Sequence, residues 1–261
     1  MQLHYLGYPG TLGCDAVDAI VADGIVLPPG DERHCHEAIH RLPRCYQVND
    51  ARRALPPPAA RSVLGLPDAA VVLACFNQTY KLSREFFTLW LAALAAVPAA
   101  VLWLNAPLAL ARANLQAEAA RAGVDPARIV FANRAPPVEH IARLRAADLA
   151  LDVLPCSSHT TGSDALWAGV PLLSCLGSTF AGRVGASLLD ATGLEQLVVA
   201  SPAAYGAELV RLAANRDELH ALRSHLETCR MELPLFDTAG FTRDWERLLE
   251  RVYDRTVPAD R

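Results

Sequence analysis

The stretch that decides the fold reads LDVLPCSSHTTGSDALWAGVP and covers residues 151–171. It begins with a short apolar run typical of a strand, continues through a polar turn and enters a helix. The first N–H groups of a helix have no partners within it, and the peptide dipoles add positive charge there. The turn therefore predicts an anion site, to which His159, Thr160 and Thr161 add side-chain donors. Asp164 follows about one turn later, where its carboxylate can accept hydrogen bonds from the paired hydroxyls of a sugar.

A plain helix cap is the alternative interpretation of the same turn. Thr160 or Ser158 would then cap the helix, and His159 would be an ordinary surface residue. The turn by itself leaves both interpretations open.

The bulk composition indicates a globular protein with a large core. The chain has 261 residues, of which 52% are hydrophobic. A formal charge of −4 without any run of Lys or Arg favours neither nucleic acid nor an anionic membrane surface as a partner.

Targeting signals are not evident in the sequence. The N-terminus lacks the basic start and apolar core of a signal peptide, and no segment reaches the roughly 18 apolar residues of a membrane span. The seven cysteines are scattered without a CxxC pair, which suits a reducing compartment. We therefore expect a cytoplasmic protein.

From residue 61 onward, short apolar runs alternate with helical patterns. Such alternation requires crossover connections, so it predicts an α/β fold with a doubly wound parallel sheet covered on both faces. Two further helices, 217–231 and 238–253, follow the last strand. The expected strands are 69–76, 99–104, 129–131, 149–152, 171–175 and 197–200, and the expected helices are 84–97, 108–122, 138–146, one from residue 160, 180–192 and 202–215.

Residues 1–58 differ from the rest because Pro and Gly interrupt their apolar pieces. We expect this segment to lack a core of its own. The run Pro56-Pro-Pro58 marks the predicted boundary to a domain at 59–236, and the final segment, 237–261, carries an apolar stripe that should pack back on residues 1–58.

A metal site is a weaker possibility within the first segment. His34, His36, His40 and Cys45 lie close together in the sequence, but their spacing completes no common zinc motif. A solvated helix across 36–40 is the preferred interpretation, and we expect no metal.

Three loops carry polar groups at the predicted carboxyl ends of strands, where α/β sheets bind their ligands. Lys81 could neutralise a phosphate, Gln78 could bond a ribose or phosphate oxygen, and His140 could bind a flat base beside the backbone of Ala135. Each has a plain alternative: a solvated lysine, a loop hydrogen-bonder and an exposed histidine on the first turn of a helix.

Missing motifs narrow the class of ligand. The chain has no GxGxxG after its first predicted strand, no Walker-type GK[ST], no GxSxG elbow and no DxD pair for a metal–diphosphate. The remaining hypothesis is a nucleoside diphosphate held without metal by a helix end and a lysine.

Several strings in fixed order resemble the catalytic region of the protein O-GlcNAc transferases, glycosyltransferase family 41. The resemblance runs over nearly the whole chain. The strings are LGYPGTLG (6–13), CFNQTYK (75–81), VLWL (101–104), RIVF (128–131), HTTGSD (159–164), LWAG (166–169), RVGAS (183–187) and PLF (234–236).

The resemblance implies a GT-B glycosyltransferase that moves N-acetylglucosamine from UDP-GlcNAc to Ser or Thr hydroxyls of protein acceptors, with inversion and without a metal. Residues 1–58 would be the tail of the first catalytic domain, and 59–236 would bind UDP. By position, Gln78 and Lys81 resemble the residues that bind the nucleotide and diphosphate, and Lys81 also resembles the catalytic residue. Ala135 and His140 resemble the residues that bind uracil, and Asp164 resembles the residue that binds the ribose. The diphosphate cradle corresponds to His159, Thr160 and Thr161, and the loop that lines the sugar corresponds to Leu6, Gly7 and Pro9.

The chain also departs from the family pattern. Pro137 replaces a lysine near the nucleotide, and the family carries a histidine-bearing domain and tetratricopeptide repeats ahead of the LGYPG loop. We therefore expect the donor-binding half of a transferase. The alternatives are a UDP-sugar-binding module without transferase activity and a related transferase that uses UDP-glucose.

Overall fold

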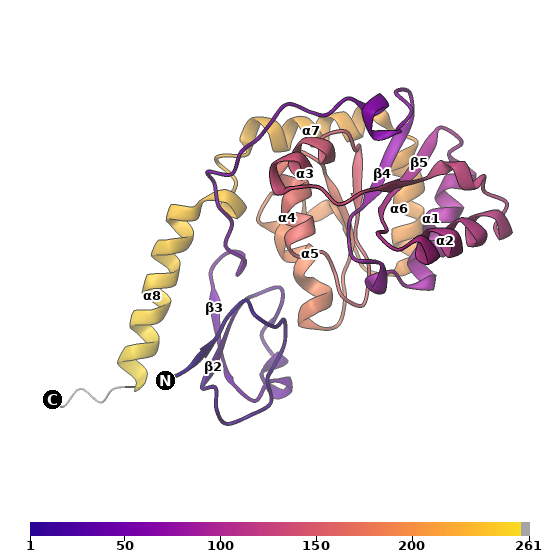
Figure 1. Cartoon of the computed structure of the whole chain (residues 1–261). Coiled ribbons are helices and arrows are strands. Elements are labelled where there is room, and N and C mark those ends of the chain that lie inside the picture. The colour runs from indigo at the N-terminus through magenta and orange to yellow at the C-terminus, as the bar shows by residue number, and fades with distance from the viewer. Residues whose placement is uncertain (257–261) are drawn as a thin grey trace.

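Two parallel sheets organise the chain in the computed structural model, which describes residues 1–256 (Figure 1). The large sheet has six strands in the order β6-β5-β4-β7-β8-β9, and the small sheet has three in the order β1-β2-β3. The strands are β1 (Leu3–His4), β2 (Ala19–Asp23), β3 (Ala38–Leu42), β4 (Val71–Cys75), β5 (Ala100–Asn105), β6 (Ile129–Ala132), β7 (Leu149–Leu151), β8 (Leu172–Cys175) and β9 (Val198–Val199).

Helices cover both faces of the large sheet. On one face α1 packs against α6, and on the other α3, α4 and α5 lie side by side (Figure 1). The helices are α1 (Arg84–Ala96), α2 (Ala109–Arg121), α3 (Pro137–Leu144), α4 (Thr160–Trp167), α5 (Phe180–Asp190), α6 (Pro202–Ala213), α7 (Arg216–Cys229) and α8 (Thr238–Thr256). The predicted doubly wound α/β sheet is confirmed.

The strand order creates a crevice at the centre of the large sheet. Within the large sheet, the chain enters at the central strand β4 and adds β5 and then β6 on one side. It then returns to the centre with β7 and adds β8 and β9 on the other side. The loops leaving β4 and β7 therefore diverge to opposite faces, which opens a ligand crevice at their carboxyl ends. Both strands are fully buried, so the crevice lies directly over the core of the sheet.

The structure of residues 1–58 corrects one expectation. Residues 1–58 contain a parallel sheet whose central strand β2 is buried at every position. The expected helix across 36–40 is wrong, because Ala38–Leu42 is strand β3 and pairs with β2, with Ile39 opposite Ile20. Pairing with a distant strand overrides the local sequence pattern here.

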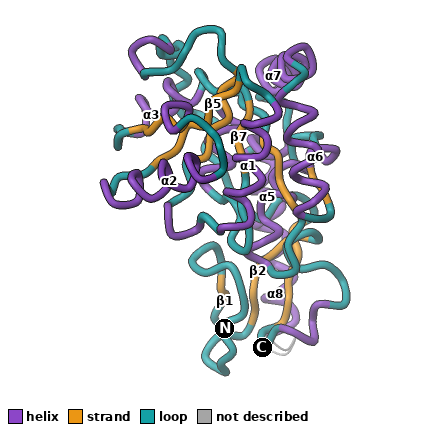
Figure 2. The backbone as a smooth tube through the Cα atoms, turned by 90° about the vertical axis from the view of Figure 1, so that its right-hand side faces the viewer, coloured by secondary structure: helices purple, strands orange, loops and turns teal. Residues whose placement is uncertain are grey.

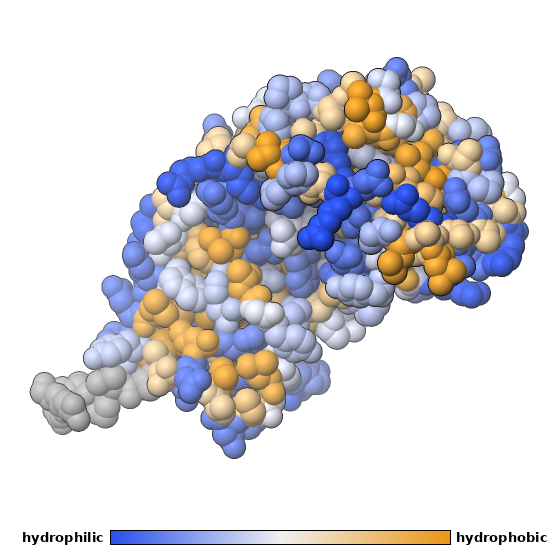
Figure 3. Space-filling model, in the orientation of Figure 1, coloured by the Kyte–Doolittle hydropathy of each residue, from blue (hydrophilic) through white to orange (hydrophobic). Residues whose placement is uncertain are grey.

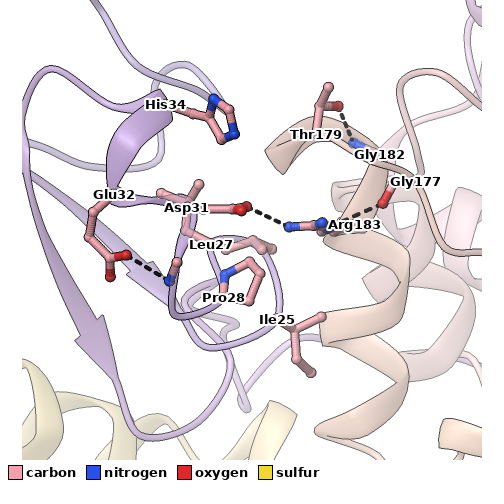
Figure 4. A network of polar contacts seen from close by, with 12 residues as sticks. Ile25, Leu27, Pro28, Asp31, Glu32, His34, Gly177, Thr179, Gly182 and Arg183 are labelled. Carbon is pink, nitrogen blue, oxygen red and sulfur yellow. Dashed lines mark hydrogen bonds and ion pairs between the residues drawn. The ribbon is translucent and has the colours of Figure 1, made fainter.

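Polar contacts join residues 1–58 to helix α5, which covers one face of the large sheet. The carboxylate of Asp23 in β2 accepts a hydrogen bond of 2.6 Å from the Ser187 hydroxyl of α5. Nearer the start of α5, Arg183 forms an ion pair with Asp31, with 2.7 Å between Nη1 and Oδ2, and donates to the carbonyl of Gly177 (Figure 4). These contacts fix residues 1–58 beside the helices that follow β7 and β8.

The last helix lies alongside the small sheet, away from α1 and α2 (Figures 1 and 2). The ring centroids of Tyr5 and Trp245 are 4.4 Å apart, and Arg44 forms ion pairs with Asp237 and Asp244. The domain limits 1–58, 59–236 and 237–261 stay predictions, and residues 257–261 of the third segment lie outside the described residues.

The outer surface shows no single dominant apolar area on the face seen in Figure 3, where small apolar groups are separated by polar residues. Among residues 1–256, no helix combines the length and apolar character needed to cross a membrane.

Candidate functional site

The loop after β4 and the turn before α4 meet at the crevice. The amide of Asn77 donates to the Ser158 hydroxyl at 2.8 Å and accepts from the Thr161 hydroxyl at 2.9 Å. In addition, the ammonium group of Lys81 lies 3.3 Å from the carbonyl oxygen of Ser157. Lys81 and the first turn of α4 therefore lie together, as the anion-site hypothesis requires.

The N-terminus of α4 carries free backbone donors. The N–H groups of Gly162 and Ser163 both donate to the His159 carbonyl, whereas in residues 1–256 no acceptor takes the N–H of Thr160 or Thr161. His159 is the N-cap residue and no side chain caps the helix, so a plain cap by Thr160 or Ser158 is wrong. Two unpaired N–H groups at a helix start favour an anion.

Buried Asp152 shapes the turn that leads into α4. Its Oδ1 atom accepts from the N–H groups of Ser158 at 2.5 Å and Val153 at 2.8 Å, and its Oδ2 atom accepts from the Ser174 hydroxyl at 2.6 Å. Burial raises the pKa of this carboxyl, against the effect of these hydrogen bonds. Because α5 passes close by, a Cβ atom at Gly185 would lie only 2.3 Å from Asp152 Oδ2. Sequence reasoning did not identify Asp152.

A pocket of about 290 Å³ lies between the first segment and α4. It brings the predicted residues Leu6 and Pro9 together with His159 and Thr160, although the two pairs lie far apart in the sequence. Gly7 belongs to the same loop without lining the pocket. The lining residues are Leu6, Tyr8, Pro9, Tyr46, Gln47, Val48, Asn49, Asp50, Arg53, His159, Thr160 and Ser163.

The loop that lines this pocket has an unusual backbone. Leu6 has a φ of 63°, in the left-handed region that residues with a Cβ rarely adopt. The N–H of Gly7 donates to the Tyr5 carbonyl at 2.8 Å, which closes a three-residue turn on Leu6. The turn leaves the Leu6 side chain half exposed at the pocket.

His140 is held as a neutral ring facing Asp164. Burial, with a further contribution from the nearby Arg143 charge, lowers the pKa of His140 to about 4. Arg143 donates to Nδ1 of this ring at 2.9 Å, so Nε2 carries the proton, and Nε2 lies 4.0 Å from Asp164 Oδ2. The alternative of an exposed histidine is therefore wrong.

Asp164 has a partner that the sequence did not suggest. Its Oδ1 atom lies 2.5 Å from Nη1 of Arg53, which comes from the coil between the two sheets. Burial raises the pKa of Asp164, while Arg53 acts in the opposite direction.

A second pocket, of about 360 Å³, contains Ala135 together with Trp103, Phe131 and Arg143. It is separate from the first pocket. Contacts from Arg143 through His140 and Asp164 to Arg53 connect the two pockets. Gln78 is exposed and lines neither pocket.

The charge at the crevice is concentrated in few groups. Burial, together with the charge of Lys81, lowers the pKa of His159 to about 4, so this ring is neutral at pH 7. Lys81 is the only lysine of the chain, and the other strongly basic side chains are arginines. Within residues 1–256, no group of three or more His, Cys, Asp and Glu side chains could hold a metal ion.

Residues 57–245 match a known family, described as glycosyl transferase family 41. The chain belongs to this family. It is 39% identical over 260 residues to the probable UDP-N-acetylglucosamine–peptide N-acetylglucosaminyltransferase SEC of Arabidopsis thaliana. This alignment covers 97% of this chain and 26% of the SEC protein. A Caenorhabditis elegans UDP-N-acetylglucosamine–peptide N-acetylglucosaminyltransferase is 35% identical over 196 residues, 75% of this chain and 17% of that protein.

Solved structures agree with this assignment. A variant of the Thermobaculum terrenum O-GlcNAc transferase superposes with a TM-score of 0.88 and 30% identity, over 97% of this chain and 48% of that one. A sucrose-phosphate synthase from Thermosynechococcus elongatus, at 15% identity and a TM-score of 0.63, covers 93% of this chain and 60% of that one and shows the shared fold alone. The chain thus spans about a quarter of the length of the SEC protein and about half of the Thermobaculum enzyme.

Proposed function

We propose that this chain forms the donor-binding half of a protein O-GlcNAc transferase, which moves N-acetylglucosamine from UDP-GlcNAc to Ser or Thr hydroxyls with inversion. The observation that carries the proposal is the junction of Lys81 with the uncapped first turn of α4 at the switch point of the large sheet. Its relatives' names supply the sugar and the peptide acceptor.

The proposed division of labour follows the order of contacts along the crevice. Uracil would lie at Ala135 and His140, the ribose at Asp164, and the diphosphate at Lys81 with His159, Thr160 and Thr161. Gln78 lies on the same loop as Lys81 and would reach the nucleotide from its exposed position. Leu6, Gly7 and Pro9 would face the sugar across the first pocket.

The chemistry of an inverting transfer suits these groups. As the acceptor hydroxyl attacks the anomeric carbon, it gives its proton to a base or to water, the bond to UDP breaks and negative charge grows on the departing diphosphate. The Lys81 ammonium and the Thr160 and Thr161 amides would stabilise that charge in the transition state. With a cation and a helix end at one point, we propose that no metal takes part. The free cysteines support a reducing, cytoplasmic compartment.

The experiment is a calorimetric titration with UDP and UDP-GlcNAc in the presence of a chelator, followed by an assay of labelled sugar transfer to protein. Binding and transfer support the proposal, and transfer from UDP-glucose instead would correct the donor. Binding without transfer would indicate a UDP-sugar-binding module, and no binding of UDP would overturn the assignment of this crevice.

A further inference from the structure

Arg53 is a charged residue at the crevice to which neither the sequence motifs nor the family match assigns a role. It lies outside residues 57–245 of the family match and belongs to the coil that leads from the small sheet to the large one. Its side chain nevertheless lines the same pocket as His159 and Thr160.

Two contacts fix the guanidinium group of Arg53. Its Nη1 atom donates to Asp164 Oδ1 at 2.5 Å, and its central carbon lies 5.1 Å from the ring centroid of Trp167. Both partners are in α4, so the helix that starts at the proposed diphosphate site also orients Arg53. A guanidinium stacked on an indole ring has its plane set before any ligand arrives.

Only one edge of the guanidinium is in use. The Nε and Nη2 atoms are buried and have no hydrogen-bond partner among residues 1–256. These two atoms form one edge of the planar group, with parallel N–H bonds that match two oxygens of a phosphate. Leaving such donors buried and unpaired costs free energy, which a ligand oxygen would recover.

The surrounding charges make an anion the fitting ligand. One oxygen of Asp164 faces Arg53, while the other lies on the side of His140. Because His140 and His159 are both neutral at pH 7, the positive charge beside the turn comes from Lys81 on the β4 loop and Arg53 in the first pocket, with Arg143 further away at His140. A diphosphate between Lys81 and Arg53 would meet a cation on each side and the free N–H groups of Thr160 and Thr161.

We propose that Arg53 is a further donor-binding residue, which grips the diphosphate of the nucleotide through its Nε and Nη2 atoms while Asp164 and Trp167 hold it in place. The inference rests on the proposed function, because it assumes that a nucleoside diphosphate is the ligand. The Nε and Nη2 atoms are buried in the free chain, but the side chain is 23% exposed, so the group can turn within the plane set by Trp167 and bring this edge to the pocket when the ligand enters. Asp164 would then act twice, as a ligand of the ribose and as a positioning residue for Arg53.

The test compares Arg53→Gln with Arg52→Gln in calorimetric titrations with UDP and with uridine. Arg52 is the neighbouring arginine, its side chain is 96% exposed, and it lines neither pocket, so it serves as the matched control. We expect Arg53→Gln to weaken UDP binding about tenfold or more, since a charge-assisted pair of hydrogen bonds is lost, and to weaken uridine binding less than about threefold. Arg52→Gln should leave both affinities unchanged.

Three results would overturn the inference. Unchanged or tighter UDP binding by Arg53→Gln would show that Arg53 is only a counterion of Asp164. Equal losses for UDP and uridine would show that it merely supports the fold. If Arg53→Gln does not fold, Arg53→Lys takes its place, because lysine keeps the positive charge and lacks the paired N–H donors. UDP affinity equal to that of the wild type in Arg53→Lys would contradict the proposed grip. Absence of UDP binding by the wild-type chain would instead refute the proposed function.

Discussion

The Nζ atom of Lys81 lies 3.3 Å from the carbonyl oxygen of Ser157, so the ammonium group that follows β4 touches the turn that precedes α4. Two loops separated by more than seventy residues thus form one cationic corner at the switch point of the sheet. The proposed function depends on this contact, and the role of each side chain near it can be tested separately.

Replacing the ammonium should affect the diphosphate alone. We expect Lys81→Ala to weaken UDP binding about tenfold or more while uridine binding changes less than about twofold, because a charge-assisted contact is lost only with the diphosphate. Calorimetric titration of both ligands measures this difference. Equal losses would place Lys81 elsewhere than at the diphosphate.

Replacing the carboxylate should give the opposite pattern. Asp164→Asn should weaken uridine binding about fivefold to tenfold, because the ribose loses a partner, and should weaken UDP binding at least as much, because Asp164 also positions Arg53. The uracil base alone should bind as before, which provides the control. If uridine binds the variant normally, Asp164 does not contact the ribose.

The buried His159 makes stability depend on pH. Its pKa is 6.5 in the unfolded chain and about 4 in the folded one, because burial and the Lys81 charge disfavour the imidazolium. Between these values the unfolded chain binds more protons, so the free energy of unfolding falls as pH drops from about 6.5 to about 4. The raised pKa of Asp164 acts in the opposite sense.

The variant His159→Gln isolates this contribution. From pH 7 to pH 4.5, we expect its free energy of unfolding to fall by about 2 kcal/mol less than that of the wild type in denaturant titrations. A pH dependence identical to the wild type would mean that His159 is as readily protonated as a free side chain.

The close approach of α5 to Asp152 should make Gly185 intolerant of a side chain. A Cβ atom there would lie 2.3 Å from Asp152 Oδ2 and 2.5 Å from Ser174 Oγ. Gly185→Ala should therefore lower the free energy of unfolding by about 2 kcal/mol or more, measured by chemical denaturation. Gly24→Ala is the control, because a Cβ atom at Gly24 would have no atom within 4 Å besides those of its chain neighbours, and a similar loss there would refute the packing argument.

The large sheet could be predicted because its central strands β4, β5, β7 and β8 are buried on both faces. Val71–Cys75 and its neighbours are therefore continuous apolar runs separated by helices of sufficient length for crossovers. The small sheet was missed because β1 has two residues and β2 and β3 pair across loops rich in Pro and Gly. Their pairing is a tertiary effect that local patterns do not contain.

Sequence patterns could predict those candidate site residues that stand at the ends of strands and helices. Lys81, His159, Thr160 and Thr161 stand at strand ends and at a helix start, which are positions that the sequence pattern reveals. Arg53 was missed because it lies in a coil without periodicity and contacts Asp164, which is 111 positions away in the sequence. Asp152 was missed because a carboxylate at the end of a strand has many possible roles, and only its buried contacts distinguish them.

The central claim is that the diphosphate of a nucleotide contacts Lys81 at the first turn of α4. Because Lys81 is the only lysine, an amine-reactive reagent has two targets, the Lys81 ammonium and the Met1 amine, which mass spectrometry distinguishes. The most direct measurement is the rate of modification of each amine with and without saturating UDP. We expect UDP to slow modification of Lys81 by about tenfold or more and to leave Met1 unaffected, whereas an unchanged rate at Lys81 would contradict the claim.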